Sequence, residues 1–132
     1  MANSKRFGVH IMSRFSATLR EHARYPSNQG HLADADAIGK ASVHGQPPYI
    51  TIYLKFADDR VSQARFEAHG CGVTTAACSV LTELVTGLSQ DQCLALTSID
   101  VERALEGLPP DKAHCGKVAV MAMHNALKEQ QS

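Results

Sequence analysis

The sequence lacks the features that mark several protein classes. Its 132 residues contain 13 Lys plus Arg and 13 Asp plus Glu, so no excess of charge favours nucleic acid or an anionic membrane. No apolar run approaches the length of a membrane span, and none follows Lys5 and Arg6 as a secretory signal requires. We therefore expect a cytoplasmic protein whose partners are proteins or metals, with neither nucleic acid nor membrane among them.

Cysteine is also scarce. The four residues are Cys71, Cys78, Cys93 and Cys115, and none precedes position 71. Because 44% of the residues are hydrophobic, the chain can form a core without disulfides, which leaves the thiols free for metal or sulfur chemistry. Gly-rich phosphate loops, nucleophile elbows and HExxH motifs are absent as well, and we do not expect an enzyme.

The order of the patterned segments predicts one domain, residues 13–132, after a tail formed by residues 1–12. Apolar residues at helical spacing predict a first helix over residues 13–24, which Pro26 ends. A loop follows. Alternating apolar and polar residues then predict strands near 37–43, 49–56 and 61–68, and we expect Gly45, Pro47 and Pro48 to interrupt pairing between the first two.

The second half of the chain has helical periodicity. A continuous apolar stripe predicts a helix from about residue 73 to Gly87, and Cys78 lies off that stripe. Ser89 and Gln92 have the spacing of a capping box, and Asp100 is a candidate cap for the next helix. After an extended Leu108–Pro110 break, a last helix is predicted from about residue 111 or 112 to 128.

Strands that precede helices in this way predict an α+β fold, a three-stranded antiparallel sheet with helices packed on one face. Within it, Cys71 stands in a Gly-Cys-Gly turn between a strand and a helix, and Cys115 in the first turn of the last helix. Because helix N-termini favour thiolates, both are candidate metal ligands or sulfur nucleophiles. His114 adds an imidazole, so Cys71, His114 and Cys115 could together bind iron or zinc.

Cys78 and Cys93 are interpreted as structural, because free cysteines usually behave as small buried hydrophobic residues and neither belongs to a ligand motif. Because Cys71 and Cys115 are candidate ligands of one site, we expect them to approach each other at one end of the sheet. We expect Cys78 and Cys93 to stand apart. His44 and His69 each occupy a loop or turn that could approach the same end of the sheet.

Four blocks carry a more specific pattern. They are Phe15–His22, Gly30–Gly39, Ala64–Gly72 and Leu108–Cys115. In order and separation these blocks resemble the NifU/IscU family of iron–sulfur cluster scaffolds over about residues 14 to 128, and the last is similar to its LPPVKxHC segment. The resemblance implies the NifU/IscU-like version of the predicted fold.

The resemblance also implies roles for particular residues. Cys71, His114 and Cys115 take the places of ligands for iron, zinc or a labile iron–sulfur cluster, and Cys115 that of a sulfur acceptor facing a cysteine desulfurase. Leu108–Lys112 takes the place of a recognition segment for a DnaK-type chaperone, with Asp111 where that branch has Val. Whether the chain forms a homo-oligomer is left open.

One family motif is missing. Where the family has Cys-Gly-Asp before its second strand, this chain reads His-Gly-Gln-Pro-Pro-Tyr over residues 44–49. The fourth ligand must then be His44, a water, a partner's cysteine or a second subunit, and we expect the metal or cluster to be weakly held. The predicted function is a scaffold or carrier with a reduced ligand set. The alternative is a non-assembling relative that acts as sulfur acceptor or regulatory binding partner of a cysteine desulfurase.

Overall fold

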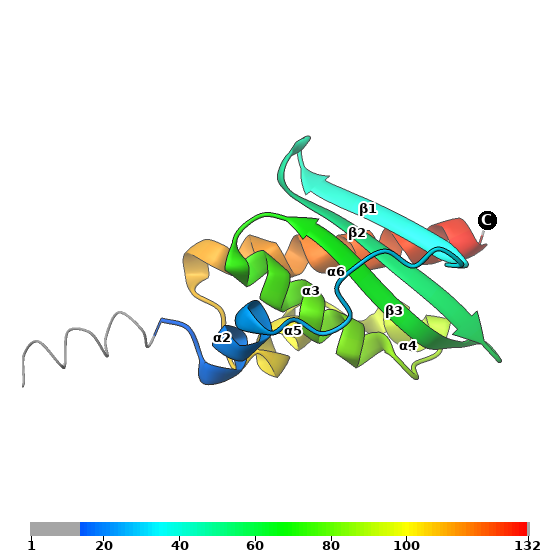
Figure 1. Ribbon diagram of the computed structural model, residues 1–132, viewed down its shortest axis with the longest axis horizontal. Coiled ribbons are helices and arrows are strands. Elements are labelled where there is room, and N and C mark those ends of the chain that lie inside the picture. The colour runs from blue at the N-terminus through cyan, green and yellow to red at the C-terminus, as the bar shows by residue number, and fades with distance from the viewer. Residues whose placement is uncertain (1–13, 132) are drawn as a thin grey trace, which may run out of the picture.

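The computed structural model describes residues 14–131, and the expected tail, residues 1–12, lies outside this range. A layer of sheet lies against a layer of helices (Figure 1). The elements in chain order are α2 (Ala17–Arg24), β1 (Ala37–Val43), β2 (Gln46–Ala57), β3 (Arg60–His69), α3 (Gly72–Val85), α4 (Gln90–Ala95), α5 (Ser98–Ala104), the 3-10 helix η1 (Pro110–Lys112) and α6 (Ala113–Gln131). None of the helices within the described range is long and apolar enough to cross a membrane.

The three strands form one antiparallel sheet in the order β1-β2-β3, which confirms the predicted fold class. Ile52 in the central strand pairs with Gly39 on one side and with Phe66 on the other. The alternate residues Ile50, Ile52 and Leu54 are buried beneath the sheet, as the period of two requires. The helices α3 and α6 cover this same face (Figure 1).

The expected interruption at Gly45, Pro47 and Pro48 is correct for the pairing but not for the strand: neither proline has a paired residue in β1 or β3, although the strand continues through both. The strand β2 already begins at Gln46, which pairs with Val43, and both prolines lie inside it. Two features explain why the sheet accepts them: they stand at the first residues of the strand, and the register with β1 shifts between Ala41 and Val43.

Helix α6 lies unusually close to β1 because Gly39 has no side chain. A Cβ atom placed on Gly39 would lie 2.0 Å from the backbone carbonyl oxygen of Ala122 and 2.3 Å from the backbone nitrogen of Ala126. The contact therefore joins backbone to backbone, and it fixes the height of α6 above the sheet. Since Cys115 belongs to the same helix, this packing also positions the candidate site.

Helix α3 is the central helix, and almost its whole circumference is buried. It contacts α2, β3, α5 and α6. Consequently Cys78, predicted to lie off the apolar stripe, is fully buried, and so are the polar residues Thr74, Ser79 and Thr82. A helix that is buried on every side has no single stripe, so Cys78 is buried although it lies off the apolar stripe, in agreement with its interpretation as a structural residue.

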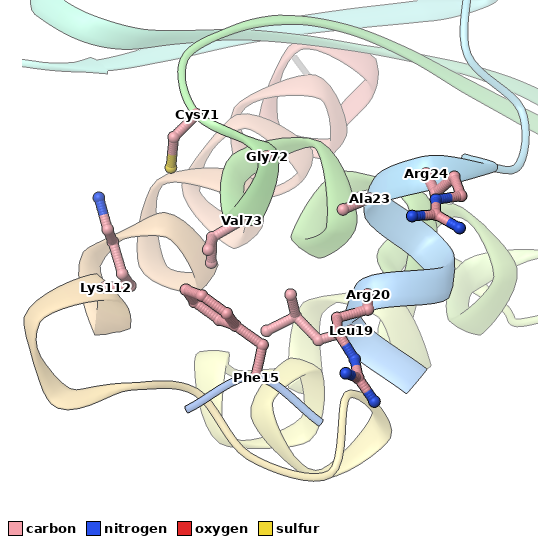
Figure 2. Close-up of a pocket in the computed structure, with 9 residues that line it drawn as sticks. All are labelled: Phe15, Leu19, Arg20, Ala23, Arg24, Cys71, Gly72, Val73 and Lys112. Atoms are coloured by element: carbon pink, nitrogen blue, oxygen red, sulfur yellow. The ribbon is translucent and has the colours of Figure 1, made fainter. Parts of the chain in front are cut away.

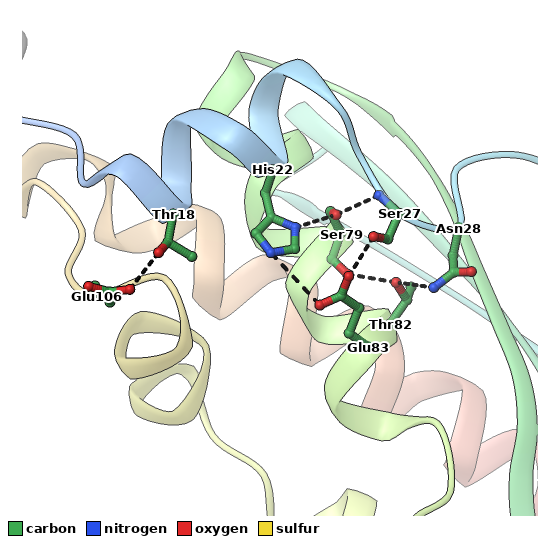
Figure 3. Close-up of polar contacts among 8 residues, drawn as sticks. All are labelled: Thr18, His22, Ser27, Asn28, Ser79, Thr82, Glu83 and Glu106. Carbon is green, nitrogen blue, oxygen red and sulfur yellow. Dashed lines mark hydrogen bonds and ion pairs between the residues drawn. The ribbon is translucent and has the colours of Figure 1, made fainter.

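A polar network holds α2 and the following turn against α3 (Figure 3). The Ser79 hydroxyl accepts a hydrogen bond from the Ser27 backbone N–H at 2.7 Å and contacts Nδ1 of His22 at 2.7 Å. The Asn28 side chain donates to the Thr82 hydroxyl at 3.1 Å. These bonds satisfy hydroxyl groups that α3 buries, and they place α2 beside the start of α3.

The helix boundaries differ from the predicted ones in detail. The capping box of Ser89 and Gln92 at α4 is confirmed. The cap of α5 is Thr97 and not Asp100, which is the second residue of a capping box with Thr97. Helix α2 begins after its cap Ser16, later than predicted. Pro110 starts η1 instead of extending the break, because proline fits the first position of a helical turn.

Candidate functional site at Cys71 and Cys115

Cys71 stands at the junction of β3 and α3. It is the N-cap residue of α3, and its side chain is exposed. The preceding Gly70 makes this turn possible, because a Cβ there would lie 2.8 Å from the Thr74 hydroxyl oxygen and 2.9 Å from Pro48. The first glycine of the Gly-Cys-Gly turn is therefore required for the close approach of β2 and α3 beside the thiol.

Cys115 lies in the first turn of α6 and is completely buried. The hydroxyl of Thr74, which is itself buried, donates a hydrogen bond to the Cys115 sulfur at 3.3 Å. The Cys71 sulfur lies 3.7 Å from the same hydroxyl oxygen. The predicted approach of Cys71 and Cys115 at one end of the sheet is thus confirmed, and Thr74 is a member of the site that sequence reasoning missed.

His114 lies beside Cys115, and its Nε2 atom is 3.7 Å from the Cys115 sulfur. His44 forms the two-residue turn between β1 and β2 with Gly45, both at positive φ, and is exposed. For residues 14–131, no hydrogen bond or ion pair joins His44 to the thiols. Nor is any group of three or more His, Cys, Asp or Glu side chains in this range arranged to hold a metal ion. A site of Cys71, His114, Cys115 and His44 stays a prediction.

The two thiols have opposite electrostatic environments. Partial burial would raise the pKa of Cys71, but the backbone and hydroxyl of Thr74, the backbone of Val73 and the charge of Lys112 hold this pKa below its ordinary value. Burial raises the pKa of Cys115 despite the hydrogen bond from Thr74. The expectation that a helix N-terminus favours the thiolate is therefore correct for Cys71 and wrong for Cys115, where burial outweighs it.

The remaining cysteines differ from each other. Burial raises the pKa of Cys78 strongly, and the nearby Cys115 thiol adds to this effect. The expectation that Cys78 stands apart from the site is therefore wrong. Cys78 is also one helical turn beyond Thr74, on the same side of α3. Burial alone raises the pKa of Cys93 to about 11, and Cys93 does stand apart.

A groove of about 590 Å³ leads to Cys71 (Figure 2). Its apolar lining comes from Phe15, Leu19, Ala23 and Val73, and its cationic lining from Arg20, Arg24 and Lys112. No carboxylate is among the lining residues. In Figure 2 the Cys71 sulfur and Lys112 lie at one end, while the two arginines project from α2 at the other. Arg20 and Arg24 are four residues apart on a helix, the one sequence signal that could have indicated this cationic edge.

Comparisons with known proteins agree with this fold. The family described as NifU-like N terminal domain matches residues 15–132. The iron-sulfur cluster assembly scaffold protein IscU 1 of Archaeoglobus fulgidus is 33% identical over 113 residues, 86% of this chain and 74% of that protein. The scaffold protein IscU of Escherichia coli K12 is 31% identical over 122 residues, 89% of this chain and 94% of that protein.

Two solved structures share the fold at low sequence identity. A NifU-like protein (N-terminal) from Brucella abortus has a TM-score of 0.71 and 18% identity, covering 88% of this chain and 93% of that one. The putative iron-sulfur cluster assembly scaffold protein for the SUF system from Fervidobacterium islandicum has a TM-score of 0.70 and 16% identity, covering 87% and 97%.

Proposed function

This chain belongs to the NifU-like N-terminal domain family, and from that premise we propose that it is an iron–sulfur cluster assembly scaffold or carrier. Its cargo is iron, zinc or a labile cluster, held by a reduced ligand set. The observation that carries the proposal is the pairing of Cys71 and Cys115 on one hydroxyl, at the end of an open groove. Thiolates and imidazole are the ligands that iron and zinc favour in such sites.

We assign the ligands to Cys71, His114 and Cys115. The Cys115 sulfur lies 3.3 Å from the Thr74 hydroxyl oxygen and 3.7 Å from Nε2 of His114, and the Cys71 sulfur lies 3.7 Å from the same oxygen. The three side chains therefore lie in one region of the fold and would rearrange to share an ion. Such a shell lacks one member, because the turn that follows β1 provides His44 and Gly45 instead of a cysteine. His44, a second subunit or a partner would close it, and the cargo would be weakly held.

The groove supports a protein partner. Its apolar floor and three cationic side chains suit an acidic segment with an apolar residue, and its far end exposes the Cys71 thiol. A cysteine desulfurase, which delivers sulfur as a cysteine persulfide, is the partner we assign to it. Leu108–Lys112 is a second candidate surface, for a DnaK-type chaperone. Within it Asp111 forms a 2.7 Å ion pair with Arg14.

Anaerobic reconstitution with ferrous iron and sulfide tests the proposal. Bound iron and acid-labile sulfide are measured for the parent, for Cys71→Ser and for Cys115→Ser, with Cys93→Ser as the control because Cys93 stands apart. The first two variants should lose both, and the control should retain them. Equal iron content in all four proteins would contradict the scaffold function.

The absence of a three-ligand group within residues 14–131 favours a second candidate function. The chain would then be a non-assembling relative that accepts sulfur from a cysteine desulfurase or regulates it. In that case the parent would bind the desulfurase and change its turnover, while holding neither iron nor sulfide after reconstitution.

A further inference from the structure

The Thr74 hydroxyl lies between the two thiols. Its oxygen is 3.3 Å from the Cys115 sulfur and 3.7 Å from the Cys71 sulfur, and only 1% of the residue is exposed. A buried hydroxyl needs partners, and the Thr74 hydroxyl contacts both cysteine sulfurs. The hydroxyl group of Thr74 therefore links the two thiols.

The two thiols differ in access. Cys71 is exposed and lines the groove that leads to it from α2 and Lys112 (Figure 2). Cys115 is fully buried. Its sulfur contacts Thr74 in the first turn of α3, the helix that Cys71 caps. A bulky sulfur donor can therefore reach Cys71 first, whereas the resemblance alone would make Cys115 the receiver.

We propose that sulfur enters this protein on Cys71 and passes to Cys115, with Thr74 as the positioning residue between them. This inference rests on the proposed function, because it concerns how the same site receives its sulfur. The donor is a persulfide, carried by a protein cysteine or by a small thiol. Cys115 then receives the sulfur from Cys71 and not directly from the donor.

Both steps balance without an added oxidant. In the first, the Cys71 thiolate attacks the terminal sulfur of the donor R–S–SH; the donor S–S bond breaks, a new S–S bond forms on Cys71, and R–S⁻ leaves. In the second, the Cys115 sulfur attacks that terminal sulfur, the Cys71 persulfide bond breaks, and the proton of Cys115 ends on the Cys71 sulfur. The Thr74 hydroxyl, which contacts both sulfurs, orients this exchange.

The test uses the full chain, reduced and anaerobic, with glutathione persulfide as the sulfur donor. Alkylation and peptide fragmentation by mass spectrometry locate the added sulfur over time. In the parent we expect sulfur first on Cys71 and later on Cys115. Cys115→Ser should accumulate it on Cys71, and Cys71→Ser should lose labelling at Cys115. Labelling of Cys115 at the parent rate in Cys71→Ser would overturn the proposal.

Thr74 is tested separately. Thr74→Val keeps the shape but removes the hydroxyl, so transfer from Cys71 to Cys115 should slow about tenfold or more while the first labelling of Cys71 is unchanged. Thr74→Ser should restore the transfer, and the half-buried Thr75→Val is the matched control. If Thr74→Val transfers sulfur at the parent rate, Thr74 has no positioning role. Thermal unfolding of each variant shows whether it is folded.

The outcomes separate this inference from the proposed function. A protein that assembles clusters but takes sulfur directly on Cys115 keeps the function and overturns the route. A protein that passes sulfur from Cys71 to Cys115 but never retains iron keeps the route and supports the sulfur-acceptor alternative.

Discussion

At the scale of single residues, Cys71 and Cys115 share a hydrogen-bonding neighbour but differ in solvent and charge. Cys71 is exposed near Lys112, and the factors around it hold its pKa below the ordinary value. Cys115 is buried, and its pKa is raised. The thiolate is the reactive form, so the opposite directions of the two pKa shifts favour reaction at Cys71 over reaction at Cys115.

Lys112→Ala should raise the pKa of Cys71, because the substitution removes a positive charge that favours the thiolate. The pH profile of Cys71 alkylation by iodoacetamide should then shift to higher pH, and the rate near neutral pH should fall. Lys117→Ala, which removes an exposed lysine further along α6, is the control. Coinciding profiles for parent and Lys112→Ala would show that Lys112 does not act on this thiol.

Ser79→Ala tests the network that holds α2 to α3. It leaves the Ser27 N–H and the His22 ring without their buried partner, so we expect a loss of about 1–3 kcal/mol in the free energy of unfolding. Ser62→Ala removes an exposed hydrogen bond to the Lys55 carbonyl and should change stability by less than about 0.5 kcal/mol. Urea titration measures both. Similar losses in the two variants would show that the network adds nothing specific.

At the scale of elements, the packing of α6 on β1 and of α3 among its neighbours positions the site. Alternation in β2 and β3 and the helical period after Gly72 were enough to predict the sheet, its order of elements and the two helices that carry the cysteines. The inclusion of the prolines in β2 and the proximity of Cys78 to Cys115 could not be predicted, because each depends on neighbours distant in sequence. The same is true of Thr74, whose contact with Cys115 forms only where α3 meets α6.

Gly39→Ala should be strongly destabilising. The new Cβ would lie 2.0 Å from a backbone oxygen of α6, which cannot rotate away, so the helix must shift. Overpacking of this kind costs about 1–3 kcal/mol or more in the free energy of unfolding. Gly116→Ala is the matched control on α6, where a Cβ would find neighbours no closer than 3.6 Å and the helix gains an alanine. Equal midpoints in thermal unfolding would contradict this account of the α6–β1 contact.

At the scale of the whole molecule, the site is an end of the fold where three segments meet. They are the β3–α3 turn with Cys71, the start of α6 with Cys115, and the groove wall formed by α2. The sequence identified the cysteines of the first two segments, because glycines and a Pro-Pro pair mark them. It could not identify the groove, because Arg20 and Arg24 become a wall only when the Ser79 network places α2 against α3.

If the proposed ligand set is correct, the turn after β1 should determine how firmly the protein holds its metal or cluster. Gln46 is the first residue of β2 and lies in the segment that replaces the Cys-Gly-Asp motif, so Gln46→Cys adds a third thiolate and brings Cys71, His114 and Cys115 to the four ligands of a tetrahedral site. A thiolate adds both a bond and a negative charge, and we expect zinc or a reconstituted cluster to resist a chelator longer in this variant than in the parent. His44→Ala should shorten retention in the parent if His44 closes the shell, and His31→Ala, whose ring lies edge to face with Tyr53 away from the turn, is its control. Retention in the parent as long as in Gln46→Cys, with no effect of His44→Ala, would show that the shell needs no borrowed ligand. Retention that rises with protein concentration in the parent alone would identify a second subunit as the donor.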